Sequence, residues 1–296
     1  MTHFPQTAAP VRDDRLELYR RMWVLRRLDM ALEELRADGL IDDAARGQFG
    51  QEAVVIGTLA ALRPGDLVNA AAAHFRHAQQ VSLALPLGPA IAGAIAPKPR
   101  VGGADWKRAL ANETALGQSI LFALGDANAQ RLAGDGEVSL CVIADRDAHS
   151  VEFTAAAGIA AQWRLPVVFV VENIRGATGA RRRAYDCDAT SVLSVDGRDV
   201  VAVADSVAEA VRRAGVGDGP TLVEAITYQS NHPVAVDPLV FARRQLIAAG
   251  GNDDHLDEVE RRARHLVAEA MVVARALVRA QQIPSASEST PWPAAS

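Results

Sequence analysis

Two clusters of polar side chains each follow an apolar run, and they hold the residue types best suited to chemistry. In the first cluster, Asp145, Asp147 and His149 alternate in the sequence. Carboxylates and imidazole are metal ligands, and the guanidinium of Arg146 can bind phosphate oxygens directly. Two interpretations stay open. The segment is a polar turn with a helix N-cap, or it is a rebuilt metal or anion site in which Arg146 or the arginines 181–183 supply counter-charge.

The second cluster, residues 172–176, follows the apolar run 165–171 and combines acidic, amide and basic side chains with a glycine. In open α/β sheets, ligands bind beyond the carboxyl ends of the strands. If both apolar runs are strands of one sheet, the two clusters lie where such a site would form.

Helical periodicity and short apolar runs alternate along the chain. We expect helices over residues 16–37, 51–62, 115–132, 152–163, 206–214, 239–248 and 256–281, and strands over residues 138–144, 165–171 and 221–227. Residues 86–104 are rich in proline and glycine, which predicts an irregular loop. The fold class is therefore α/β: a doubly wound, mainly parallel sheet with helices on both faces, a helical N-terminal lead-in and C-terminal helices.

The domain organisation is predicted to be simple. Residues 1–15 are interpreted as a flexible arm, because most of them show no periodic pattern. Residues 16–283 are predicted to form one domain, since no linker interrupts them. Residues 284–296 are rich in Ser, Pro and Ala, which predicts a disordered tail.

Composition excludes several classes of function. The net charge of -5 argues against nucleic acid as a partner, because phosphate binding needs a positive field. No apolar stretch reaches the length of about 18 residues that spans a membrane, and no signal pattern opens the chain, so we expect a cytoplasmic protein. The two cysteines, Cys141 and Cys187, fit no metal-binding spacing.

The two polar clusters together resemble the thiamine diphosphate motif. That motif has Gly-Asp-Gly at one strand end and Glu-Asn-Asn at the next, where this chain has Ala144–Arg146 and Glu172–Ile174. Further landmarks occur in the right order at residues 16–22, 50–53, 62–66, 165–170, 195–200, 219–225 and 237–238. The chain therefore resembles the alpha subunit of the decarboxylating component of 2-oxoacid dehydrogenases (pyruvate, branched-chain or acetoin type), as a degenerate member.

This resemblance implies the thiamine-diphosphate-binding fold, thiamine diphosphate and Mg²⁺ as cofactors, and an oxidoreductase built as a two-alpha, two-beta assembly. The beta subunit would supply the glutamate that activates the thiamine ring. Asp145 is then the candidate metal ligand. A vestigial or rebuilt cofactor site would comprise Asp145, Arg146, His149, Asn173 and Gly176.

The departures from the family pattern fall on this site. Arg146 replaces the second glycine, which puts a long cationic side chain where the backbone should approach phosphate. Ile174 replaces the second asparagine and offers no oxygen. Gly176 replaces an aromatic residue, although its backbone carbonyl remains. One carboxylate and one carbonyl make a poor magnesium site.

A phosphate-contacting segment is also altered. The family's Tyr-Arg-x-His aligns with residues 72–75, where Ala73 and Phe75 replace the arginine and the histidine. An alignment shifted by one residue would recover His74 and Arg76 for the same role, and this alternative stays open.

The loop that covers the active site in the family is shortened here. His232 stands near the position of the family's Gly-His-Ser histidine and is the one candidate for a catalytic residue. Pro233 replaces the serine, and Asp237 follows almost at once. Without a cover, a reactive carbanion intermediate would meet water.

Three hypotheses follow. The chain is a non-catalytic alpha subunit, structural or regulatory, that partners a beta subunit. Alternatively, it is an active thiamine diphosphate enzyme that decarboxylates a 2-oxoacid or transfers its acyl group with unusual cofactor anchoring. The third possibility is a binding module for another small anion, motivated by Arg146.

Overall fold

The computed structural model describes residues 12–40, 49–70, 73–95, 116–176, 185, 190–229, 232 and 234–281. The predicted tail at residues 284–296 and the arginines 181–183 lie outside the described residues, as do the side chains of His74 and Arg76. Residues 12–15 of the predicted arm belong to the first helix. The prediction of one domain stays a prediction.

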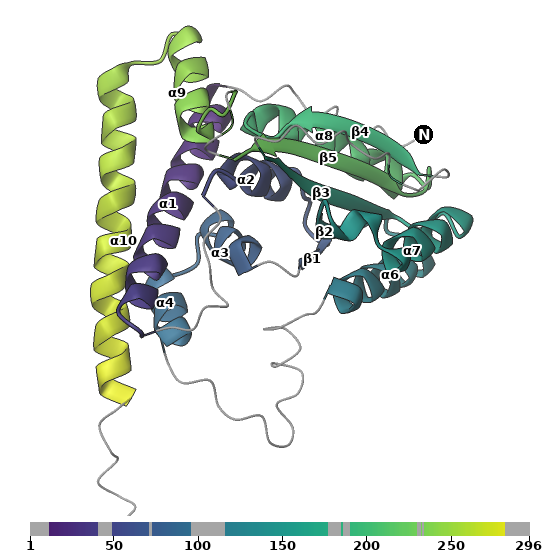
Figure 1. Ribbon diagram of the computed structural model, residues 1–296, viewed down its shortest axis with the longest axis horizontal. Helices are drawn as coiled ribbons and strands as arrows, with labels where there is room; N and C mark the ends of the chain where they lie inside the picture. The colour runs from purple at the N-terminus through teal and green to yellow at the C-terminus, as the bar shows by residue number, and fades with distance from the viewer. Residues whose placement is uncertain are drawn as a thin grey trace, which may run out of the picture.

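Five parallel strands form the central sheet, in the order β1-β2-β3-β5-β4 (Figure 1). The strands are β1 Leu67–Ala70, β2 Ser139–Ala144, β3 Val167–Arg175, β4 Ser191–Asp196 and β5 Thr221–Tyr228. The predicted parallel, doubly wound sheet is confirmed. The residues of β1 and β4 were not predicted as strands.

Alternate residues of β2 enter two separate cores, one on each face of the sheet. The sheet is covered by α2 Glu52–Ala60, α6 Leu116–Ala133, α7 Val151–Gln162 and α8 Val200–Gly215, and α1 Arg12–Ala37 packs on α2. Leu140 and Val142 pack with residues of α1, α2 and α8. Cys141 and Ile143 pack with residues of α6 and α7. This two-sided burial is why the strands read as continuous apolar runs.

A helical layer lies beyond α2 and α8. It consists of α1 with α3 Ala73–Ser82, α4 Leu87–Ile95, α9 Pro238–Ala248 and α10 Asp253–Gln281, and α10 runs alongside α1 in Figure 1. The predicted apolar stripe of α1 is buried: the exposed fraction is 0% for Met22 and Leu35. Among the described residues, no helix is both long and apolar enough to cross a membrane.

Residues 86–104 were predicted to form an irregular loop, and this prediction is wrong for their first part, which forms helix α4. Pro89 lies in the first turn of α4, where a missing N–H removes no helical hydrogen bond. Gly88 permits close packing, because a Cβ atom there would lie 2.7 Å from Cγ1 of Val273 in α10. Residues that predict a loop from their type are thus helical because of a tertiary contact.

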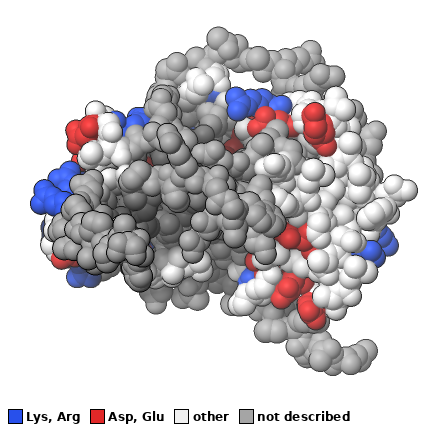
Figure 2. Space-filling model, turned by 90° about the horizontal axis from the view of Figure 1, so that it is seen from below, with Lys and Arg blue, Asp and Glu red and all other residues white. Residues whose placement is uncertain are grey.

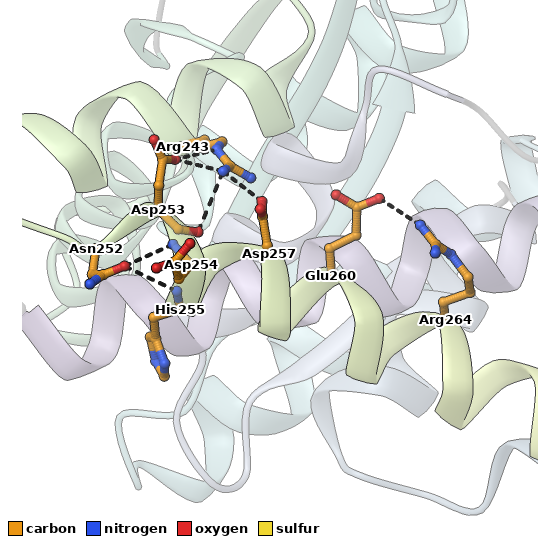
Figure 3. A network of polar contacts seen from close by, with 8 residues as sticks. All are labelled: Arg243, Asn252, Asp253, Asp254, His255, Asp257, Glu260 and Arg264. Atoms are coloured by element: carbon orange, nitrogen blue, oxygen red, sulfur yellow. Dashed lines mark hydrogen bonds and ion pairs between the residues drawn. The ribbon is translucent and has the colours of Figure 1, made fainter.

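Polar contacts fix the junction of α9 and α10 (Figure 3). Oδ1 of Asn252 accepts from the backbone N–H of Asp254 at 2.8 Å and caps α10. The Arg243 guanidinium lies 2.6 Å from carboxylate oxygens of both Asp253 and Asp257. Glu260 also accepts from Arg27 at 2.7 Å, which ties α10 to α1.

Burial makes Cys141 chemically inert. Its side chain is fully buried, and burial raises the pKa of the thiol to about 12. Because the thiolate is the reactive form, we expect Cys141 not to react with a disulfide reagent at pH 8 in the native protein. The measurement is thiol titration of the Cys187→Ser variant, with no thiol titrated in buffer and one in denaturant. Rapid reaction of the folded variant would contradict this burial.

Candidate functional site

Asp145 lies directly beyond β2, where its backbone N–H donates to the carbonyl of Glu172 at 3.0 Å. The phenol of Tyr185 donates to Oδ1 of Asp145 at 2.7 Å. The ring of His149 stacks on Tyr185, with centroids 5.0 Å apart and planes 14° apart. Nε2 of His149 is 3.7 Å from the same Asp145 oxygen. Asp145, His149 and Tyr185 therefore lie together in one cluster.

A buried carboxylate on β5, two strands away from β2, extends this cluster. Glu224 of β5 is fully buried. One of its oxygens accepts from Nδ2 of Asn173 at 2.6 Å, and the other accepts from the hydroxyl of Ser194 at 2.7 Å. The phenol of Tyr185 lies 3.4 Å from Glu224 and thus connects the two carboxylates. Asn173 is therefore turned toward Glu224 as a donor.

Local sequence explains this arrangement. Side chains alternate across a strand, so Asp145 continues the face on which Ile143 is buried against α7. The strand register places Glu224 beside Val171 on one side and Ser194 on the other. Donors from β3 and β4 therefore meet a carboxylate of β5, which lies between these two strands.

The turn after β2 matches the first of the two interpretations left open by the sequence. Asp145 and Arg146 form a turn, and residues 147–149 form a short 3₁₀ helix. The cap of α7 is Ser150, whose hydroxyl accepts from the backbone N–H of Phe153 at 3.1 Å. This part of the chain is a polar turn that leads into a capped helix.

Arg146 does not join the cluster. Its side chain is 88% exposed, and its Nε atom lies 3.4 Å from a carboxylate oxygen of Asp147. Ile174 is 40% exposed at the end of β3. Gly176 lies beside Gln229, whose Oε1 atom would be 3.3 Å from a Cβ atom at that glycine. The roles of Arg146 and Gly176 in cofactor binding stay predictions.

His232 belongs to a separate group of side chains around Arg198. The ring of His232 packs on Tyr228 with centroids 4.6 Å apart, and its Nδ1 atom accepts from the backbone of Val234 at 3.3 Å. The guanidinium of Arg198 lies over Tyr228 and Phe241. The same guanidinium donates to the carbonyl of Val234 at 3.1 Å. These contacts hold His232 and Val234 close to Tyr228 at the end of β5. A catalytic role of His232 stays a prediction.

The described residues offer few ligands for a magnesium ion. No group of three or more His, Cys, Asp or Glu side chains in the described part of the chain could hold a metal. Oδ1 of Asp145 already accepts a hydrogen bond from Tyr185, and Ile174 has no side-chain oxygen. Mg²⁺ needs six oxygen ligands in near-octahedral geometry, of which a protein usually supplies one or two carboxylates.

Comparison with known proteins decides the family. A family model described as the dehydrogenase E1 component matches residues 20–281. This chain belongs to the dehydrogenase E1 component family. It is 30% identical over 273 residues to pyruvate dehydrogenase E1 component subunit alpha of Zymomonas mobilis, covering 84% of this chain and 76% of that protein.

Two further relatives are also alpha subunits. The pyruvate dehydrogenase E1 component subunit alpha of Rhizobium meliloti is 28% identical over 275 residues, covering 85% of this chain and 77% of that protein. The alpha subunit of acetoin:2,6-dichlorophenolindophenol oxidoreductase of Bacillus subtilis is 28% identical over 234 residues, covering 73% of this chain and 70% of that protein. The predicted resemblance is confirmed, and this E1 chain is of the alpha type.

Two residues of the cluster were not singled out from the sequence. Glu224 has a visible signal, because it is a lone carboxylate inside the apolar strand β5. Tyr185 has none, since it stands apart from every periodic element and 40 residues from Asp145. The substituted phosphate-contacting residues at 72–75 cannot be placed with the cluster, because the side chains of residues 72–74 lie outside the described residues.

Proposed function

We propose that this chain is the alpha-type subunit of a thiamine-diphosphate-dependent 2-oxoacid dehydrogenase-like enzyme whose magnesium and diphosphate site is degraded. In this proposal it is a structural or regulatory partner of a beta subunit, in a cytoplasmic assembly of two alpha and two beta chains. Members of the E1 family use thiamine diphosphate and Mg²⁺. In this proposal the chain keeps the fold of the family members but does not bind the two cofactors.

One observation carries the proposal: Tyr185 donates to Asp145 at 2.7 Å, so the retained metal ligand already has a donor from its own chain. Glu224 likewise has donors in Asn173 and Ser194. A site built for a cation presents its carboxylate oxygens to the ion. Here the carboxylates are satisfied by neutral donors of the same protein, which supports a fold that is stable without cofactor.

The scaffold function is supported by what is retained. The Arg26 guanidinium joins Glu52 of α2 to Asp237 at the start of α9, and Gln51 donates to Thr227 of β5 at 2.8 Å. These contacts belong to the landmark at residues 50–53 and are internal to the chain. An alpha-type chain can therefore keep its architecture while its ligand positions change.

Cofactor content of the assembled complex tests the proposal. The chain is co-expressed with a beta subunit and purified with thiamine diphosphate and Mg²⁺ present. We expect a stable complex in which thiamine diphosphate, measured as thiochrome fluorescence, is well below one per alpha chain. Adding both cofactors should move the melting temperature of the complex by no more than about 1 °C, because a ligand that does not bind the native state cannot stabilise it.

A back-substituted variant serves as the matched control. In Arg146→Gly/Ile174→Asn/Tyr185→Phe, the family's second glycine and second asparagine are restored and the internal donor is removed. A cofactor-dependent rise in melting temperature of this variant alone would assign the loss to these residues. Stoichiometric cofactor in the unmodified complex, lost in Asp145→Ala, would overturn the proposal and support the alternative: an active enzyme that decarboxylates a 2-oxoacid with unusual anchoring.

A further inference from the structure

The side chain of Tyr185 reaches the carboxyl ends of the strands although it belongs to none of the five strands. Its hydroxyl donates to Oδ1 of Asp145 at 2.7 Å and lies 3.4 Å from Oε1 of Glu224. Its ring stacks on that of His149 with centroids 5.0 Å apart. The residue is buried. Tyr185 is therefore fixed in the region where an open α/β sheet binds its ligands.

The hydroxyl oxygen of Tyr185 occupies a position that two carboxylates share. Carboxylate oxygens lie about 2.0–2.6 Å from a hard divalent cation that they bind. The oxygens of Asp145 and Glu224 are 2.7 and 3.4 Å from the hydroxyl, so small shifts of the two side chains would bring both within reach of one ion. The hydroxyl itself is uncharged and has a single proton to donate. It therefore fills the place of a shared cation without supplying the charge of one.

We infer that Tyr185 is an autoinhibitory contact, whose phenol excludes a hard divalent cation from the position between Asp145 and Glu224. The inference rests on the proposed function and deepens it, because affinity for a cation is then blocked by one side chain and not lost with the substituted ligands. The Asp145 side chain is 36% exposed, so an ion can reach it from solvent. Water would supply the remaining ligands, as it commonly does for Mg²⁺ held by one or two carboxylates.

Binding of Mn²⁺ to the full chain, without thiamine diphosphate, tests this contact. Mn²⁺ prefers the same oxygen ligands as Mg²⁺, and electron paramagnetic resonance measures the free ion. We expect Tyr185→Ala to bind one Mn²⁺ with a Kd at least about tenfold below that of the unmodified chain, because the ion no longer has to break a hydrogen bond to a carboxylate. Adding Asp145→Asn to this variant should remove the gain.

A second variant and a matched control accompany the measurement. Tyr185→Phe keeps the ring over His149 and removes only the hydroxyl, so it should also gain Mn²⁺ binding, by a smaller factor because the ring still fills part of the space. Tyr228→Ala removes a half-buried tyrosine at the end of β5 and should change nothing. On the face drawn in Figure 2, the described acidic side chains lie near basic ones, so we expect loose binding of Mn²⁺ there to be the same in every variant.

The outcomes separate this inference from the proposed function. If neither Tyr185→Ala nor Tyr185→Phe binds Mn²⁺ better than the unmodified chain, while circular dichroism shows folded protein, the autoinhibitory contact is overturned and the proposed function stands. A gain that survives Asp145→Asn also overturns it, because the ion then binds elsewhere. Tight binding of Mn²⁺ by the unmodified chain, lost in Asp145→Asn, overturns both, since the site is then neither blocked nor degraded.

Discussion

Replacing Arg26 by methionine is expected to lower the free energy of unfolding by about 3–5 kcal/mol. The Arg26 side chain is 15% exposed, and that of its partner Glu52 is only 1% exposed. Burial alone would lower the pKa of Arg26, but the hydrogen bond and charge of Glu52, with the charge of Asp237, raise it above its ordinary value. Methionine keeps much of the volume and leaves the Glu52 carboxylate buried without its counter-charge.

Chemical denaturation measures this loss, and α1 itself offers the matched control. Arg20 pairs with Glu17 on the same helix, but their side chains are 41% and 40% exposed. Water screens such a pair, so Arg20→Met should cost no more than about 1 kcal/mol. The double variant Arg26→Met/Glu52→Gln removes the buried charge as well and should recover much of the loss. Equal instability of the single and double variants would show that packing, and not charge, is responsible.

Most of the fold could be predicted from the sequence because the central strands of the sheet are buried on both faces. Strands β2 and β3 carry apolar residues at every position of their central parts, and β5 does so apart from Glu224, which distinguishes these strands from helices with a stripe. The stripe of α1 was equally clear. Strand β1 was missed because it has only four residues at the edge of the sheet, where Leu67 is 44% exposed.

Only some residues of the candidate site could be predicted from the sequence. Asp145, His149 and Asn173 stand at strand ends, and the topology rule for open sheets places them together. Their hydrogen-bond partners could not be predicted from the sequence. Tyr185 reaches Asp145 from a segment with no periodic pattern, and no local rule connects the two positions. Glu224 was read as part of a landmark, and its role became visible only when Ser194 and Asn173 were placed on either side of it.

This difference bears on the proposed loss of the cofactor site. The sequence shows Ile174 at the position of the family's second asparagine. The sequence alone does not show which hydrogen bonds the remaining polar side chains form. The structure shows that Asp145 and Glu224 share the Tyr185 phenol. Buried polar groups that lose a ligand cost free energy unless other donors replace it. A site whose remaining carboxylates have internal donors is therefore stable in the absence of a metal.

Removing the acceptor at the centre of this network should have the second large effect. Glu224→Leu is expected to lower the free energy of unfolding by about 2–4 kcal/mol, since a buried donor without a partner costs about 1–3 kcal/mol. Asn173 is 6% exposed and cannot turn to water, so its amide would lose its acceptor, whereas Tyr185 keeps its hydrogen bond to Asp145. Ser194 is exposed and can bind water, so it should contribute little to the loss.

Glu224→Gln is the matched control, because it keeps the shape and one acceptor oxygen and should cost only about 1 kcal/mol. Both variants are compared by urea denaturation without thiamine diphosphate or Mg²⁺, so the result does not depend on cofactor. A Glu224→Leu chain as stable as the unmodified one would mean that the amide of Asn173 finds another acceptor. Strands β3 and β5 would then be held together without this carboxylate.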